Sequence, residues 1–448
     1  MHASEAKATT LVSTPAVSVV RIGIVGYGTV GQATAEILAS HAEEIRQRSG
    51  APLVVTRICR RTPRPSEAGI NGAPVLDNWR EVVGASDVDI VVEAIGGTDV
   101  AFDVARAAIA NGKPVVTANK ALIAQHGEEL FALAREKNLP IGIEASVAGG
   151  VPVIRAISEA LAADRIHAVY GIVNGTCNYI LTQMERHEID FEQALHDAQS
   201  AGYAEADPSL DIDGLDARDK ITILARIAFN GAIVPAQVPV AGIRRVLATD
   251  FHYARRLDST IRLVAAAERL KDGIRISVRP WLVGHDSMLA KVDGANNAIF
   301  VVGEKAGTQM FFGPGAGGNA TATAVLSDVI HIARHLSRQQ NAPDALTGFC
   351  NRQPLLLAKQ SRPLGWYVRL TVADRPGILA QVAEAVAREN INIDSVIQEP
   401  HMHKTRLSFV VTLEPIDEAT ALRAVHAIDQ FGFMLEPALL LPIASELR

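Results

Sequence analysis

The glycine-rich segment Gly26-Tyr-Gly28-Thr29-Val30-Gly31 constrains the fold of this chain more than any other feature. It follows the short β-branched run VVRIGIV and precedes the helical pattern TVGQATAEILAS. In this position the glycines allow a tight turn and a close approach of the backbone to a pyrophosphate, whose charge faces the amides at the helix start. The segment therefore predicts a dinucleotide-binding strand, turn and helix.

Short β-branched runs and helical patterns continue to alternate beyond this segment. The runs PLVVTRIC, DVDIVVEAIGG, KPVVTANK and PIGIEAS are separated by stretches long enough for helices. Strands that alternate with helices of about 10 to 15 residues predict βαβ units and a parallel sheet. We therefore expect an α/β protein with a doubly wound (Rossmann) nucleotide domain over residues 19–148, completed by an amphipathic helix at about 319–337.

The remaining chain predicts two further domains. Residues 149–318 mix helices with strands such as HAVYGIV, IRISVRPWLV and NAIFVVG, which predicts an α+β domain for substrate binding, catalysis and dimerisation. Residues 338–365 have weak periodicity and predict a linker, and residues 366–448 follow the order β-α-β-β-α-β of a self-contained ferredoxin-like unit. Residues 1–18 lack a basic-then-apolar signal layout, so we expect a flexible tail there.

Composition limits the classes of partner. Lysine and arginine number 43 against 49 aspartates and glutamates, and the positive residues are dispersed, which argues against nucleic acid and anionic membranes as partners. Cys59, Cys177 and Cys350 are too far apart for a disulfide framework or a zinc site, which fits a reducing cytoplasm. No apolar run approaches the roughly 18 residues of a membrane span. We expect small-molecule partners.

The end of the second predicted strand bears on the choice of cofactor. An Asp or Glu at this point would bind an unphosphorylated ribose. Here Cys59 is followed by Arg60 and Arg61. Two guanidinium groups at the ribose favour a 2′-phosphate through bidentate contacts, and therefore NADP(H). The alternative is that both arginines are solvated and the cofactor is NAD(H).

Polar residues follow two further predicted strands. The segment from Glu93 to Gly97 and Thr98 follows one strand, and Thr117-Ala-Asn-Lys120 follows the next. Both lie at the carboxyl ends of parallel strands, where doubly wound folds bind ligands. We expect Lys120 to face nicotinamide or substrate; the alternative is a solvated lysine at a helix start.

The stretch GYAEADPSLDIDGLDARDK concentrates carboxylates and ends on Lys220. It does not form a calcium loop, because Lys220 stands where the bidentate glutamate belongs. At about 100° per residue, Asp216 and Lys220 continue into the apolar stripe of Ile223 and Ile227, and Arg218 lies away from it. This pattern favours a polar cleft over a solvated ion pair. A lysine flanked by carboxylates can deliver a proton to a carbonyl oxygen during hydride transfer.

Neighbouring segments offer substrate contacts, for which the candidates are Glu205, Asp211, Asn174 and Thr176. Glu205 can accept from a substrate ammonium group, and the strand-to-helix segment around Asn174 presents amides and hydroxyls. Cys177 lacks a recognisable base nearby, so a packed thiol is favoured over a nucleophile. An acylating aldehyde dehydrogenase that uses Cys177 and a non-catalytic amino-acid sensor are the alternative functions.

Together these segments resemble homoserine dehydrogenases over nearly the whole chain, and the C-terminal unit resembles an ACT domain. The motifs that carry the resemblance are the glycine segment, TANK at 117–120, EASVAGG at 144–150, NGTCNYI at 174–180, GYAEADP at 202–208, Asp213-Gly-Leu-Asp216 with Lys220, GPGAG at 313–317, and in the C-terminal unit DRPGIL at 374–379 and NINI at 390–393.

The resemblance implies reversible NAD(P)H-dependent reduction of L-aspartate 4-semialdehyde to L-homoserine, in the biosynthesis of threonine, methionine and isoleucine. It implies Lys220 as the proton donor, Asp216 as a substrate-orienting carboxylate, Lys120 between nicotinamide and substrate, and Glu205 on the substrate amino group. The expected cofactor contacts are Gly26, Gly28, Thr29, Val30, Gly31, Arg60, Arg61, Gly97, Thr98, Lys120, Gly202, Gly315 and Gly317.

The resemblance also implies a monovalent cation, usually sodium, held by Glu144 and the backbone of Val147, Gly149 and Val151. The ACT resemblance implies an amino-acid effector, with L-threonine as the first candidate, and pairing of subunits in a homodimer or homotetramer. The expected effector contacts are Gly377, Ile378, Leu379, Asn390 and Asn392.

Overall fold

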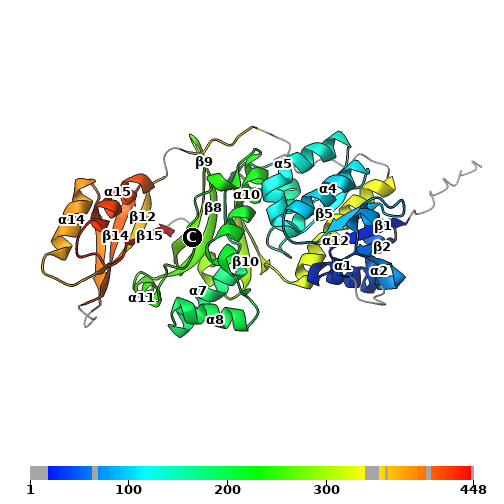
Figure 1. Cartoon of the computed structure of the whole chain (residues 1–448). Helices are drawn as coiled ribbons and strands as arrows, with labels where there is room; N and C mark the ends of the chain where they lie inside the picture. The colour runs from blue at the N-terminus through cyan, green and yellow to red at the C-terminus, as the bar shows by residue number, and fades with distance from the viewer. Residues whose placement is uncertain (1–18, 63–68, 339–352, 359–361, 400–404, 445–448) are drawn as a thin grey trace, which may run out of the picture.

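The computed structural model describes residues 19–62, 69–338, 353–358, 362–399 and 405–444. Three bodies follow one another along the molecule: an N-terminal body, a central body and a C-terminal unit (Figure 1). None of the described helices combines the length and the hydrophobicity of a membrane-crossing segment.

The N-terminal body is built on a six-stranded parallel sheet, as the alternating pattern predicted. The strand order is β3-β2-β1-β4-β5-β6, so the chain reverses direction across the sheet beside β1. The strands are β1 (Val20–Val25), β2 (Leu53–Cys59), β3 (Val75–Leu76), β4 (Ile90–Glu93), β5 (Val115–Thr117) and β6 (Ile141–Gly142).

Helices cover both faces of this sheet. One apolar cluster joins it to α1 (Thr29–Ser40), α2 (Ala42–Ser49) and α12 (Gly318–Arg338). A second joins it to α3 (Trp79–Val83), α4 (Asp99–Ala110) and α5 (Lys120–Glu136). Helix α12 follows the central body in sequence and lies beside α1 in Figure 1. The chain thus returns to the nucleotide-binding sheet after building the central body.

The central body supplies five antiparallel strands to a second sheet of order β11-β10-β7-β8-β9-β15-β12-β14-β13. Of these, β8 and β11 are strands that the sequence analysis did not name. The central strands are β7 (Ile166–Ile172), β8 (Ser259–Leu270), β9 (Gly273–Gly284), β10 (Asn296–Gly303) and β11 (Gly307–Pro314), and the main helices packed with them are α7 (Gly175–His187), α8 (Phe191–Ser200), α10 (Leu215–Phe229) and α11 (Ala248–Arg256).

The C-terminal unit has the predicted β-α-β-β-α-β order. Its elements are β12 (Leu364–Val372), α14 (Ile378–Arg388), β13 (Ile393–Gln398), β14 (Leu407–Ile416), α15 (Glu418–Asp429) and β15 (Leu439–Ala444).

The expectation that this unit is self-contained is wrong. Strand β15 pairs in parallel with β9 through Ile443↔Leu282 and Ala444↔Val283, which joins the unit to the central sheet. The unit also shares an apolar cluster with the central body, in which Trp366 and Trp281 are both fully buried. The C-terminal unit is therefore joined to the central body both by strand pairing and by a shared apolar core.

Candidate active site

Asp216 is the centre of a buried polar cluster. It lies in the first turn of α10 and is 5% exposed. Its Oδ1 lies 2.8 Å from Nζ of Lys120, and its Oδ2 lies 2.7 Å from Nζ of Lys220. Because Lys120 begins α5 and Lys220 belongs to α10, this carboxylate joins the nucleotide-binding body to the central body.

Lys220 is held from the other side by a backbone carbonyl. Its Nζ donates to the main-chain oxygen of Val173 at 2.7 Å, directly after β7. The same oxygen accepts from Nδ2 of Asn297 at 3.1 Å. A lysine with a carboxylate on one side and a carbonyl on the other is fixed in direction and keeps further N–H donor capacity.

Asn174 organises the carboxylates next to Lys220. Its Nδ2 donates to Oδ2 of Asp216 at 2.8 Å and to Oδ1 of Asp211 at 2.7 Å. Its Oδ1 accepts from the amide of Cys177 at 2.8 Å and so caps α7. One side chain therefore caps the start of a helix and bridges two carboxylates.

The charges in the cluster stabilise one another. Burial alone would raise the pKa of Asp216, but Lys220 and Lys120 outweigh it, and this pKa lies well below its ordinary value. Burial alone would lower the pKa of Lys120, but Asp216 outweighs it, and this pKa is raised. Burial raises the pKa of Asp211, with Asp216 adding to the effect. Asp216 and Lys120 therefore stay ionised at neutral pH.

Helix α10 is buried on more sides than its amphipathic pattern indicates. Asp219 is 7% exposed and Arg226 is 3% exposed, although both lie off the predicted stripe. The helix is enclosed by the second sheet and by α5, so polar side chains on several of its faces need partners inside the protein. The pattern located the inward face but underestimated how much of the helix is interior.

The first glycine turn has the geometry of a phosphate cradle. A Cβ atom on Gly26 would lie 2.4 Å from the oxygen of Ala94, and one on Gly31 would lie 2.0 Å from the oxygen of Gly26. By contrast, a Cβ on Gly28 would meet no protein atom within 4 Å. Gly26 and Gly31 thus permit the tight turn, while Gly28 leaves space in front of the start of α1. Thr29 and Val30 form the first turn of that helix.

The second glycine turn, residues 315–318, lies between this cradle and the lysine cluster. A Cβ on Gly318 would approach Cγ2 of Thr29 to 3.0 Å, and one on Gly315 would stand 2.1 Å from the side chain of Asn297. Asn297 donates to the carbonyl that also holds Lys220. The two glycine turns and Lys220 are therefore linked by successive contacts. Gly317 has a positive φ of 115°.

Comparison with known proteins agrees with this geometry. Residues 152–330 match the family model described as homoserine dehydrogenase, residues 26–144 match the homoserine dehydrogenase NAD-binding domain, and residues 366–430 match the ACT domain. A homoserine dehydrogenase of Pseudomonas aeruginosa is 41% identical over 380 residues, which cover 82% of this chain and 85% of that protein. One from Neisseria gonorrhoeae is 36% identical, covering 92% of this chain and 95% of that protein.

The chain belongs to the homoserine dehydrogenase family.

Solved structures of homoserine dehydrogenases share the fold over between 70% and 96% of this chain. A crystal structure of the homoserine dehydrogenase from Thiobacillus denitrificans superposes with a TM-score of 0.90 at 36% identity, covering 96% of this chain and 99% of that chain. A hyperthermophilic archaeal homoserine dehydrogenase in complex with NADPH has a TM-score of 0.59 at 30% identity, covering 70% of this chain and 98% of that chain. This chain is accordingly a homoserine dehydrogenase with an NAD-binding domain and a C-terminal ACT regulatory domain.

Cys177 lacks the properties of a nucleophile. It is 0% exposed, and its Sγ lies 3.1 Å from the main-chain oxygen of Asp211. Burial raises its pKa well above the ordinary value, and the charge of Asp211 adds to this effect. The buried thiol argues against an acylating aldehyde dehydrogenase, and the match to homoserine dehydrogenases over most of the chain sets aside both this alternative and the non-catalytic sensor.

The remaining cofactor candidates lie around the same edge. Gly97, with a φ of 81°, and Thr98 follow β4, and Lys120 follows β5. Arg60 and Arg61 directly follow β2, and Arg61 is exposed. All of these residues except Lys120 lie outside the Asp216 cluster.

A loop from Gly202 to Pro208 lies beside the cluster without entering it. Gly202 has a φ of 77° and is exposed. Glu205 is exposed, and its main-chain oxygen accepts from Gln199 at 3.1 Å. Thr176 donates to the main-chain oxygen of Tyr203 at 2.7 Å, which ties the loop to α7. The described structure does not bring Glu205 to the carboxylates around Asn174.

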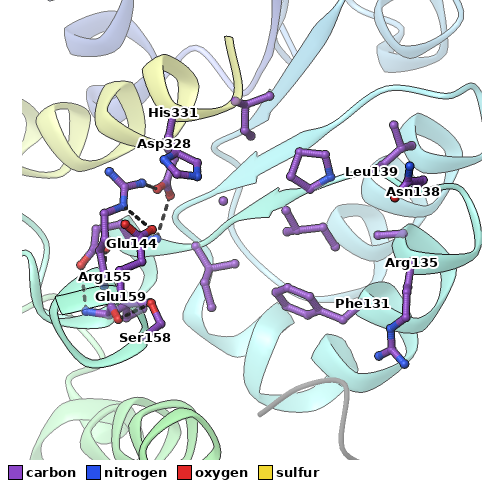
Figure 2. A pocket seen from close by; sticks show the side chains of 17 residues that line it. Phe131, Arg135, Asn138, Leu139, Glu144, Arg155, Ser158, Glu159, Asp328 and His331 are labelled. Carbon is purple, nitrogen blue, oxygen red and sulfur yellow. Dashed lines mark hydrogen bonds and ion pairs between the residues drawn. The ribbon is translucent and has the colours of Figure 1, made fainter. Parts of the chain in front are cut away.

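Glu144 acts as a helix cap in this structure. Its two carboxylate oxygens accept from the amides of Ile154 and Arg155 at 2.9 Å each. Figure 2 shows the Glu144, Arg155 and Asp328 side chains grouped together on one side of a small cavity. Arg155 pairs with Asp328 at 2.6 Å. The described residues contain no cluster of three or more His, Cys, Asp or Glu side chains arranged for a metal ion.

The ACT-domain candidates fall at the two ends of α14. Gly377, with a φ of 87°, Ile378 and the exposed Leu379 stand at its start. Asn390 and Asn392 follow its end, and Nδ2 of Asn392 donates to Glu414 at 3.0 Å. The helix has 11 residues, so its ends lie about 16 Å apart. One chain does not bring the two sets together.

Several buried polar groups at the site were missed by the sequence analysis. They are the carbonyl of Val173 and the side chains of Asn297 and Asp219. The fully buried Glu93 was named only as the start of a polar strand-end segment and was given no role. Glu93 was visible as the last residue of an otherwise apolar strand, which is a usable signal. A carbonyl has no signal in side-chain identity, and Asn297 could not be distinguished from the neighbouring Asn296.

Proposed function

We propose that this chain catalyses the reversible NADPH-dependent reduction of L-aspartate 4-semialdehyde to L-homoserine, with Lys220 as the proton donor. The observation that carries this proposal is the position of Asp216 between the ammonium groups of Lys120 and Lys220. Reduction of the aldehyde consumes one hydride and one proton and forms a primary alcohol. The cofactor supplies the hydride when it is bound.

The lysines supply the positive charge and the proton. As the aldehyde oxygen gains electrons, an ammonium group within hydrogen-bonding reach stabilises the developing alkoxide and then protonates it. Lys220 suits this role because Asp216 and the Val173 carbonyl fix its direction. Lys120 is more open, with a side chain 43% exposed, and we assign it to the cofactor side because it follows β5 at the carboxyl edge of the parallel sheet. Asp216 keeps both groups charged and in place.

The amino-acid end of the substrate needs acceptors for its ammonium group and donors for its carboxylate. Asp211 is half-buried next to Asn174. Burial raises its pKa and Asp216 adds to the effect, so a positive charge beside this carboxylate would be stabilising. A substrate ammonium group would supply that charge. Glu205 belongs to the neighbouring loop, and Thr176 is hydrogen-bonded to it. We assign both residues to a form of the site in which this loop has moved over the substrate. Closure of the loop would bring Glu205 toward the substrate.

Three features support NADP(H) as the cofactor. The space in front of Gly28 suits a pyrophosphate, because a Cβ atom there would fill it. Arg60 and Arg61 follow β2, where guanidinium groups favour a 2′-phosphate. The archaeal homoserine dehydrogenase of similar fold is in complex with NADPH.

We also assign a monovalent cation, sodium in the first instance, to the segment from Glu144 to Val151. Because the Glu144 carboxylate already binds two amides, the main-chain oxygens of Val147, Gly149 and Val151 would be its principal ligands. Ala148 and Gly149 both have a positive φ, of 55° and 52°, which curls this backbone. Activity in sodium, potassium and choline chloride at equal ionic strength tests the assignment, and equal rates in all three salts would refute it.

The ACT domain supports feedback by an amino acid, and we propose L-threonine. The amides after Gly377 begin a helix and suit a carboxylate. Because the two sets of candidates lie at opposite ends of α14, a site that uses both requires two chains, which supports a homodimer or homotetramer. Measurement of the reaction rate and of the mass of the assembly at increasing L-threonine, L-methionine or L-isoleucine tests both points. We propose a cytoplasmic location from the free thiols of Cys59 and Cys177.

The decisive test is substitution of Lys220. Lys220→Ala should lower kcat by about 10²- to 10⁴-fold while NADPH binding stays close to that of the parent. Lys305→Ala is the matched control, because the Lys305 side chain is 81% exposed and distant in the fold from Asp216. Unchanged turnover in Lys220→Ala would remove Lys220 from the mechanism.

A further inference from the structure

A buried carboxyl group lies at the nucleotide-binding edge and takes no part in the mechanism described above. Glu93 is the last residue of β4 and is 0% exposed. Its Oε1 accepts from the amide of Ile95 at 2.7 Å. Its Oε2 accepts from the hydroxyl of Thr117, at the end of the neighbouring strand β5. Glu93 therefore contacts the loops that follow both strands.

The contact with Thr117 continues to the helix that carries Lys120. Oγ1 of Thr117 accepts from the amide of Asn119 at 3.0 Å. The Oδ1 of Asn119 accepts from the amide of Leu122 at 3.1 Å and caps α5, whose first residue is Lys120. The hydrogen bonds thus run from Glu93 to the start of α5.

Asn119 also closes the network back onto the first loop. Its Nδ2 donates to the main-chain oxygen of Gly97 at 2.6 Å and to that of Ile95 at 3.3 Å. Gly97 belongs to the loop that we assign to the cofactor. Glu93 and Asn119 together fix the separation between the cofactor loop and Lys120.

A carboxyl group is a costly choice for a purely structural contact at this point. Glu93 forms no ion pair within the described part of the chain, and burial without a counter-charge is unfavourable. Burial raises its pKa to about 7. The preceding β4 residues, Ile90 to Val92, are apolar and fully buried, so an apolar residue would continue the strand more cheaply. A buried polar residue where the local pattern favours an apolar one is typical of functional sites.

We propose that Glu93 is a positioning residue for hydride transfer, which holds the Lys120 ammonium group at a fixed place relative to the cofactor loop. The inference rests on the proposed function of Lys120. Because a misplacement of about 1 Å can cost about 100-fold in rate, the network matters even though Glu93 touches neither substrate nor cofactor.

The first experiment compares two pairs of variants in the full-length enzyme. Glu93→Ala and Thr117→Val both break the link, and we expect each to lower kcat by about 10- to 100-fold with less than about a threefold change in the KM for L-homoserine. Glu93→Gln keeps an acceptor and a donor in place, and Thr117→Ser keeps the hydroxyl, so kcat should fall much less in these two variants. Two variants that approach the link from opposite sides keep the test valid if one of them fails to fold.

The second experiment separates positioning from general stability. In a Lys120→Ala background, Glu93→Ala should lower kcat by less than about threefold, because no ammonium group remains to be positioned. Multiplicative losses in the double variant would overturn the inference, as would a kcat for both Glu93→Ala and Thr117→Val equal to that of the parent. Full activity of Lys120→Ala would instead refute the proposed role of Lys120 itself. Asp103→Asn, at an exposed position on α4, is the control.

Discussion

The carboxylate of Asp250 and the guanidinium of Arg369 form an ion pair of 3.0 Å in the interior of the protein, between the central body and the ACT domain. Asp250 is 0% exposed and Arg369 is 3% exposed. Asp250 also accepts from the hydroxyl of Tyr367 at 2.7 Å and from the amide of Leu247 at 2.8 Å. The ACT domain is thus attached through buried charges as well as through the β9–β15 contact.

Breaking this pair should strongly destabilise the attachment of the ACT domain. Asp250→Ala leaves the buried Arg369 guanidinium with only the longer 3.4 Å pair to Glu436, and removal of one partner from a buried ion pair costs up to about 3–5 kcal/mol. We expect a lower denaturation midpoint in urea, together with weaker regulation by the effector. The double variant Asp250→Asn/Arg369→Met should recover part of the loss. Glu384→Ala, which removes an exposed pair with Arg388 on α14, should leave the midpoint almost unchanged.

A second contact between bodies concerns catalysis directly. Nη1 of Arg226 on α10 donates to the main-chain oxygen of Ile123 on α5 at 3.1 Å, three residues after Lys120. Arg226→Met keeps the apolar stem but loses this bond together with the two bonds from the guanidinium to the main-chain oxygen of Ile233. The α5–α10 spacing that sets the Lys120–Asp216 contact should therefore relax. We expect kcat to fall about tenfold with a small change in NADPH affinity. Arg106→Met, on the exposed side of α4, should behave as the parent does, and equal kcat values for the two variants would contradict the prediction.

Much of the fold could be predicted because its signals are local. The turn at Gly26 to Gly31 and the alternation of strands and helices are readable within short windows of sequence. Strand β8 was missed for a physical reason. Its first ten residues are all buried and include Ala265, Ala266 and Ala267. It therefore shows no alternation of buried and exposed residues, and the three alanines give its middle a low β-propensity.

In the candidate site, too, contacts between residues close in sequence could be predicted, and contacts between distant segments could not. Asp216 and Lys220 are one helical turn apart, so their adjacency follows from sequence spacing. The contacts of Lys220 with Val173 and of Glu93 with Thr117 join segments 47 and 24 residues apart. They depend on how strands are ordered in a sheet, and no spacing rule gives that order. The attachment of the ACT domain was missed for the same reason, because Asp250 and Arg369 meet only in the folded chain.

Glu93 predicts a specific dependence of stability on pH. Burial raises its pKa from 4.5 to about 7 in the folded protein. The folded chain therefore keeps a proton that the unfolded chain has released, and the resulting stability is complete below about pH 4.5 and lost as the pH rises through 7. Glu93→Gln stays neutral, so its free energy of unfolding relative to the parent should rise between pH 5 and pH 8 by at most about 3 kcal/mol, and its relative melting temperature should rise with it. Melting curves at several pH values test this, and a constant offset like that of Asp103→Asn would contradict it.

Two alanine substitutions in the first glycine turn should both weaken NADPH binding, but only one of them should lower the stability of the fold. A Cβ on Gly31 would lie 2.0 Å from the oxygen of Gly26, so Gly31→Ala forces the turn apart and should lower both the melting temperature and the affinity for NADPH. A Cβ on Gly28 meets no protein atom within 4 Å, so Gly28→Ala should melt as the parent does. The added methyl group would nevertheless occupy the space that the pyrophosphate needs, and the Kd for NADPH should rise by roughly tenfold or more. Fluorescence titration with NADPH, paired with melting curves, distinguishes the two effects. Unchanged NADPH affinity in Gly28→Ala would show that the pyrophosphate binds elsewhere.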